Sequence, residues 1–161
     1  MEYNYNRYRV KSPVKSFRDL EVYQKTIQLS DEITNLPFLN KEQFEHDSKQ
    51  IKEIAENIPK LIAEAYGDKF DSKELAHKKL TDSITLITDA ITKIDLFRQR
   101  FADARTEFGT NCVGNKEAKE ILDKLLIQYQ YQKRKVLNLR RAWQRVFTND
   151  AQQAGKFNYK K

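Results

Sequence analysis

The sequence predicts an all-α protein, folded as an up-down-up-down antiparallel four-helix bundle. Apolar residues recur at alternating steps of four and three along most of the chain, as they do on the buried face of a helix. Only 4 glycines and 3 prolines interrupt the 161 residues, and 33% of the residues are charged, which favours long helices over a β fold with many turns. A chain of this length can bury a core without disulfides or metals, so we expect one bundle over residues 17–148.

The first two helices are expected over residues 17–35 and 41–66. Ser16 is the predicted N-cap of the first, because an acid follows it three residues later, close to a capping box. The second helix has a wide apolar face that contains Pro59, from which we expect a kink and not a break. Gly67 is the predicted C′ residue that follows the end of this helix.

The last two helices are expected over residues 72–104 and 115–148. The main loop is expected between them, at residues 105–114, which include two glycines and the single cysteine. Residues 149–161 read as a polar, basic tail. With Gln132 as its one polar member, the seam of the fourth helix consists of Ala118, Leu122, Leu125, Tyr129, Val136, Leu139, Trp143 and Val146.

Basic charge is concentrated at the two ends of the chain. The net charge of +7 divides into +3 for residues 1–16, −5 for residues 17–123 and +9 for residues 124–161. Such localised charge indicates a polyanion partner, RNA in preference to DNA, although a solvated charged surface is the simpler alternative. The candidate phosphate contacts are Lys133, Arg134, Lys135, Arg140, Arg141 and Arg145, assisted by Arg7 and Arg9.

Two further features bear on partners. Leu126, Ile127 and Tyr131 form a second apolar patch on the fourth helix, which predicts a homo-oligomer because a monomeric bundle need not bury it. In the tail at residues 1–16, tyrosines alternate with Asn and Arg. Such rings are able to stack on unpaired bases. The equally weighted alternative is a disordered tail or an arm that packs on a neighbouring subunit.

Motifs for catalysis are missing. The sequence has no GxxxxGK[ST], GxGxxG or GxSxG motif. A di-iron bundle needs two Glu-x-x-His motifs, but only Glu74 and His77 form one, and His46 is the other histidine. Cys112 has no CxxC partner and no adjacent histidine. We therefore expect no enzyme activity, metal or cofactor; a two-carboxylate hydrolytic site is the alternative that the sequence leaves open.

The expected location is the cytoplasm, without a membrane. A single cysteine cannot form an internal disulfide, which favours a reducing compartment. The opening MEYNYNRYRV has no apolar segment typical of a secretory signal. No run of 18 apolar residues occurs, so no transmembrane helix is predicted.

Two stretches resemble a known family. Residues 17–25, FRDLEVYQK, resemble the opening F-x-D-L-x-V-W/Y-Q-K of the small four-helix-bundle family named after ribosomal RNA intervening-sequence proteins. Residues 58–67, IPKLIAEAYG, resemble that family's I-P-x-N-I-A-E-G-x-G. The superfamily includes Avd, the accessory variability determinant encoded beside the reverse transcriptase of diversity-generating retroelements. These motifs cover the first two helices, whereas the last two match only in pattern.

The resemblance implies a bundle that assembles as a homopentamer without known catalysis. For the Avd branch it further implies binding of a reverse transcriptase and of nucleic acid through a basic surface. The family's paired arginines in the second helix fall here at Lys52 and Glu53, and Leu61 replaces its usual Asn. We therefore expect the nucleic-acid site on the fourth helix of a non-catalytic Avd-type accessory protein. The alternative is an intervening-sequence-type protein that acts as a protein–protein scaffold without binding nucleic acid directly.

Overall fold

The computed structural model describes residues 14–108 and 113–157, with side chains placed for residues 14–100 and 116–153. This part of the chain is all-helical and contains no β-strand, as predicted. No helix within it combines the length and the apolar character needed to cross a membrane. The four α-helices are α1 (Glu21–Thr34), α2 (Glu45–Asp68), α3 (Lys73–Phe108) and α4 (Val113–Phe157).

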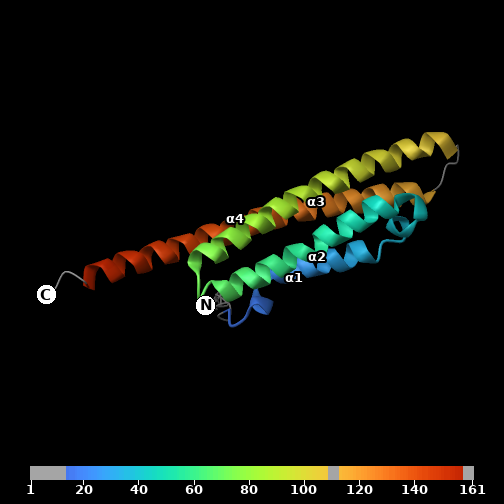
Figure 1. Cartoon of the computed structure of the whole chain (residues 1–161). Helices are drawn as coiled ribbons and strands as arrows, with labels where there is room; N and C mark the ends of the chain where they lie inside the picture. Colours follow the sequence, from blue (N-terminus) through green and yellow to red (C-terminus); the bar gives the residue numbers. More distant parts are fainter. Residues whose placement is uncertain (1–13, 109–112, 158–161) are drawn as a thin grey trace, which may run out of the picture.

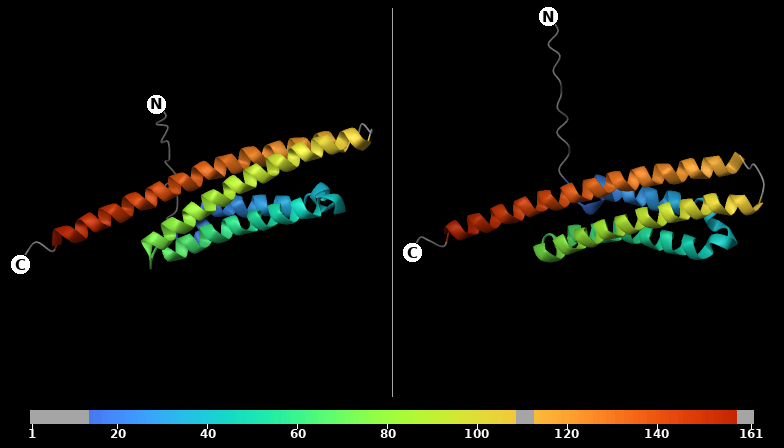
Figure 2. Two further views of the ribbon diagram at one scale, coloured as in Figure 1. Left: turned by 45° about the horizontal axis from the view of Figure 1, so that its top comes forward. Right: turned by 90° about the horizontal axis from the view of Figure 1, so that it is seen from above.

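Successive helices run in opposite directions and lie side by side (Figure 1). The helices α1 and α2 form a shorter hairpin, and α3 and α4 form a longer one. The two views in Figure 2 show the C-terminal end of α4 projecting beyond the other helices. Since α2 packs against both α1 and α3, whereas α4 packs mainly on α3 and only briefly on α1, a broad side of α4 faces solvent.

The capping box predicted at Ser16 is present, but it closes a short 3-10 turn at Phe17–Asp19. The Ser16 hydroxyl accepts from the backbone N–H of Arg18 at 3.1 Å, and the Asp19 carboxylate accepts from the backbone N–H of Ser16 at 3.0 Å. Leu20 then adopts an extended conformation, so α1 begins at Glu21 and not at the predicted Phe17.

The helix α2 begins later than predicted because two 3-10 turns, Pro37–Asn40 and Glu42–Phe44, precede it. It passes through Pro59 without interruption. The prediction that Gly67 follows the helix was wrong, because the helix continues to Asp68 and Gly67 lies inside it.

The hairpin of α3 and α4 is longer than predicted at both ends. The helix α3 continues to Phe108 and α4 has begun by Val113, so most of the loop expected at residues 105–114 is helical; Cys112 lies outside the described residues. The helix α4 also continues through most of the predicted tail, as far as Phe157. Alanines and glutamines, which favour helices, follow Thr148 at residues 151–154 and no proline interrupts them.

The core consists of the apolar faces of all four helices. On α4 the predicted seam is buried from Ala118 to Trp143, except that Leu139 is only half-buried. Val146 was wrongly assigned to the seam, because 54% of it is exposed and Phe147 packs against the core in its place. An α-helix has 3.6 residues per turn and drifts against a strict seven-residue pattern, which moves the seam by one position.

Candidate nucleic-acid interface

The solvent-facing side of α4 carries a second line of side chains. Its members recur at steps of four and three, like those of the core seam, but all of them are exposed. We call this line the outer stripe; it consists of Ile127, Tyr131, Arg134, Asn138, Arg141 and Arg145. The first two members are apolar or aromatic, and three of the other four are arginines.

The structure divides the six predicted phosphate contacts of α4 between the outer stripe and its flanks. Arg134, Arg141 and Arg145 lie on the stripe, and within the described residues no acid pairs with them. The other three, Lys133, Lys135 and Arg140, are half-buried. Arg7 and Arg9 lie outside the described residues.

Two of the flanking bases contact neighbouring helices. On the α3 side, the guanidinium of Arg140 donates to the hydroxyl of Thr81 at 3.1 Å. On the α1 side, the ammonium of Lys135 lies 3.8 Å from the Glu21 carboxylate and 5.2 Å from the centre of the Tyr131 ring. The Tyr131 hydroxyl, and after it the Glu21 charge, raise the pKa of Lys135 above its ordinary value.

A row of threonines on α3 borders the Arg140 flank. Arg140 on α4 and Thr81 on α3 lie opposite each other in the antiparallel hairpin. Lys133 lies seven residues before Arg140 and Thr88 lies seven residues after Thr81, so Lys133 and Thr88 share one level of the hairpin. The hydroxyl of every threonine in this row donates to the backbone carbonyl four residues earlier, so toward a ligand it can act only as a hydrogen-bond acceptor. The row consists of Thr81, Thr85, Thr88 and Thr92. The four-three spacing of these threonines is visible in the sequence, but the position of the row beside α4 is not.

The predicted oligomer patch is divided between two environments. Leu126 packs partly against the core of its own bundle. Ile127 and Tyr131 belong to the outer stripe, where they are 65% and 49% exposed. Only these two side chains of the patch therefore face away from the bundle.

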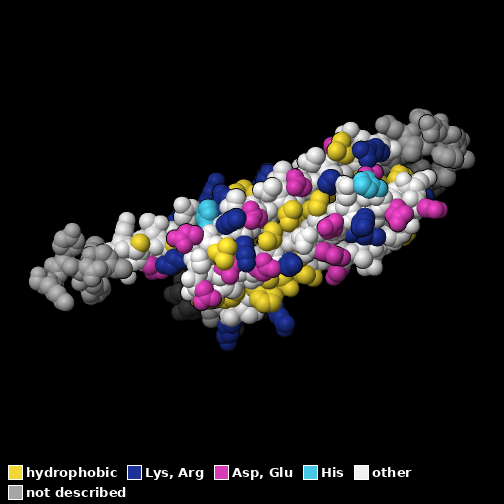
Figure 3. Space-filling model, in the orientation of Figure 1, with side chains coloured by type: hydrophobic (Ala, Val, Ile, Leu, Met, Phe, Trp, Pro, Cys, Tyr) yellow, Lys and Arg dark blue, Asp and Glu magenta, His cyan; other side chains and the backbone are white. Residues whose placement is uncertain are grey.

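The α2–α3 side of the molecule has a different charge pattern. Figure 3 shows basic and acidic side chains interleaved on the face over which these two helices run. Several bases there are paired: the Lys79 ammonium lies 2.7 Å from the Asp68 carboxylate, and the Arg100 guanidinium lies 2.9 Å from the Asp47 carboxylate. This face therefore mixes bases with acids, whereas α4 has no acid between Asp123 and Asp150.

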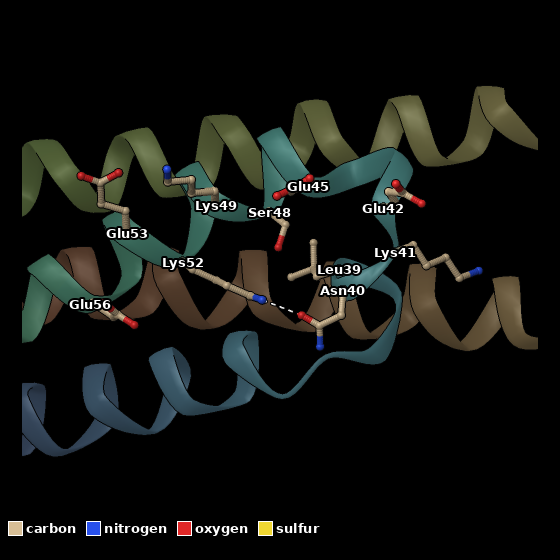
Figure 4. Close-up of a pocket in the computed structure, with 10 residues that line it drawn as sticks. All are labelled: Leu39, Asn40, Lys41, Glu42, Glu45, Ser48, Lys49, Lys52, Glu53 and Glu56. Atoms are coloured by element: carbon tan, nitrogen blue, oxygen red, sulfur yellow. Dashed lines mark hydrogen bonds between the residues drawn. The ribbon is translucent and has the colours of Figure 1, made fainter.

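A surface pocket of about 680 Å³ lies between α2 and the segment that precedes it. Four glutamates and three lysines are among its lining residues, and Figure 4 shows Lys52 reaching across toward Asn40, whose side-chain oxygen accepts from the ammonium at 2.6 Å. It contains no histidine or cysteine. Across the described residues, no three His, Cys, Asp or Glu side chains lie together in a way that could hold a metal ion.

The outer stripe thus carries two kinds of exposed side chain that suit a nucleic acid. Its arginines offer donors to phosphate oxygens, and its aromatic end offers a ring face. Comparisons of the chain with protein-family models, with curated proteins and with solved structures find no match.

Proposed function

We propose that this protein is a non-catalytic, basic accessory protein that binds nucleic acid along the outer stripe of α4. The observation that carries the proposal is the line of Arg134, Arg141 and Arg145, exposed and without acidic partners in the described chain. No acid occurs between Asp123 and Asp150, so phosphates along this line meet no repelling charge from α4 itself.

The contact is mainly electrostatic and has little sequence specificity. Arginines bind phosphate oxygens in a forked geometry, and such contacts position a nucleic acid without reading its bases. RNA is the favoured ligand class in this proposal. The motifs in helices α1 and α2 resemble the intervening-sequence family, whose superfamily includes Avd, and this resemblance supports a homopentameric partner of a reverse transcriptase. Five copies would repeat the stripe and add avidity. The single cysteine supports a cytoplasmic location.

The test is a salt titration of RNA binding, followed by fluorescence anisotropy, on protein whose oligomeric mass is known from light scattering. Each neutralised phosphate contributes about 0.7 to the log–log slope on a single strand and about 0.9 on a duplex. The stripe variant is Arg134→Glu, Arg141→Glu, Arg145→Glu. It should lose both affinity and most of the salt dependence.

The matched control reverses three exposed lysines on α1 and α2: Lys25→Glu, Lys49→Glu and Lys60→Glu. It changes the net charge by the same amount away from α4, so it should keep the salt slope of the unaltered protein. Equal losses in both variants, or no loss in the stripe variant, would show that binding depends on overall charge or on another surface. Absence of RNA binding at low salt would favour the scaffold alternative, in which the arginines face an acidic protein.

A further inference from the structure

Tyr131 is an exposed aromatic side chain in a basic environment. It lies on the outer stripe, one turn after Ile127 and three residues before Arg134, and 49% of it is exposed. The other exposed aromatic residue among the described side chains, Phe70, is followed immediately by Asp71. The nearest acid to Tyr131 on α4 is eight positions away, at Asp123.

A neighbouring lysine fixes the Tyr131 ring. The Lys135 ammonium lies 5.2 Å from the ring centre, within the range of a cation–π contact. The same ammonium is 3.8 Å from Glu21 on α1, which anchors the lysine to a second helix. The lysine thus restricts the ring while about half of the Tyr131 side chain stays open to solvent, which reduces the conformational entropy lost when a flat ligand stacks on it.

We infer that the outer stripe takes single-stranded nucleic acid, with one unpaired base stacked on Tyr131 and the following phosphates on the arginines. This inference rests on the proposed function and narrows its ligand class. Single-strand sites combine a positive track for the backbone with aromatic rings for the bases. In a duplex both faces of each internal base are already stacked, so a duplex meets the stripe through its phosphates alone.

The length of the stripe sets the size of the site. Tyr131 and Arg145 are fourteen positions apart, which is about 21 Å along a helix. A strand that kept the 3.4 Å rise that it has in a duplex would cover this distance with about six nucleotides, and a more extended strand with fewer. A strand of this length is within the usual footprint of single-strand binding modules.

A second copy of the chain is the competing occupant of this surface. Only Ile127 and Tyr131 face outward, because Leu126 packs against its own core. A stable interface buries about 800 Å² on each partner, more than two side chains supply. Extending the contact along the stripe would take Arg134, Arg141 and Arg145 into the interface, where each buried charge needs an acidic partner. Charge therefore favours the polyanion.

The test uses an eight-nucleotide RNA with one 2-aminopurine, whose fluorescence is quenched when it stacks, and a duplex of equal length. Tyr131→Ala should weaken single-strand binding about tenfold, the size of a lost stacking contact, and abolish the quenching. Duplex affinity and the salt slope should stay unchanged. Tyr131→Phe, which keeps the ring, should bind and quench like the unaltered protein.

The control variant is Leu96→Ala, which removes a comparably exposed apolar side chain from α3 and should change none of these readings. If single-strand affinity and quenching survive in Tyr131→Ala, the stacking assignment is wrong while the proposed function stands. If Tyr131→Ala instead lowers the oligomeric mass and leaves the affinity per subunit unchanged, the ring belongs to a subunit interface and the inference is overturned. If the unaltered protein binds neither RNA at low salt, the proposed function fails, and the inference with it.

Discussion

The guanidinium of Arg140 donates to the hydroxyl of Thr81 at 3.1 Å and so joins α4 to α3. Its neighbour in the sequence, Arg141, is exposed on the outer stripe and pairs with no acid in the described chain. Consecutive arginines therefore have different surroundings: the first helps to hold the hairpin together, and the second is available to a ligand.

This difference predicts opposite effects of the same substitution at the two positions. Arg141→Gln should leave the free energy of unfolding within about 0.5 kcal/mol, as is usual for a surface change, and reduce the salt slope of RNA binding by about 0.7. Arg140→Gln should cost about 1 kcal/mol of stability through the lost interhelical hydrogen bond, with a smaller effect on the slope. Urea unfolding and anisotropy titrations measure both quantities. Interchanged results would mean that Arg140 is the ligand contact.

A buried polar side chain on α4 provides a second prediction. Gln132 is 2% exposed, and its side-chain oxygen has no hydrogen-bond partner among the described residues. An unpaired buried acceptor costs about 1–3 kcal/mol, because it has lost its hydrogen bonds to water. Gln132→Leu should therefore raise the free energy of unfolding by about 1 kcal/mol in urea.

Gln130→Leu is the matched control, since Gln130 is exposed on the same helix. It makes the same chemical change without relieving a buried group, and its effect should stay within about 0.5 kcal/mol. A Gln132→Leu protein less stable than the unaltered chain would show that the amide makes a favourable contact in solution.

Tyr129 gives the protein a predicted sensitivity to high pH. Burial, with a smaller contribution from the Glu32 carboxylate, raises the pKa of the Tyr129 hydroxyl above its ordinary value. The unfolded chain therefore loses this proton at lower pH than the folded protein does. The contribution to stability is complete below the ordinary tyrosine pKa of about 10 and is lost as pH rises above it, by up to about 1.4 kcal/mol per pH unit.

Tyr129→Phe isolates this effect from the titration of the other tyrosines and the lysines. Urea unfolding at pH values of about 8, 10 and 11 should show a steeper loss of stability in the unaltered protein than in the variant. Parallel losses would contradict the burial of the hydroxyl. Because the hydroxyl also has no hydrogen-bond partner in the described residues, the variant should be no less stable at pH 8.

The sequence predicted the periodic parts of the fold better than the ends of its helices. The seam from Ala118 to Trp143 follows from spacing alone, since a helix has no other way to bury such a row. The ends were harder because one local signal suits several structures: the capping box at Ser16 closes a 3-10 turn as readily as an α-helix. Beyond Trp143, the choice between Val146 and Phe147 depended on a drift that only packing reveals.

The candidate site was predictable in composition but not in arrangement. The bases of α4 are evident from the sequence, but their separation into stripe and flanks depends on where α1 and α3 lie. Arg140 and Lys135 belong to opposite flanks because their partners, Thr81 and Glu21, are on different helices. The four-three spacing of Tyr131 and the arginines is visible in the sequence, but the exposure of this line of side chains follows only from that arrangement.

Gly67 distinguishes the two interpretations of the end of α2. The structure places it inside the helix, and a Cβ added there would meet nothing within 4 Å. Alanine favours a helix and restricts the unfolded chain, so Gly67→Ala should raise the free energy of unfolding by about 0.4–1 kcal/mol. A C′ glycine after the helix would have positive φ, where alanine is strained, and the same substitution would then destabilise the protein. Urea unfolding of this one variant decides by its sign whether α2 ends before Gly67 or after it.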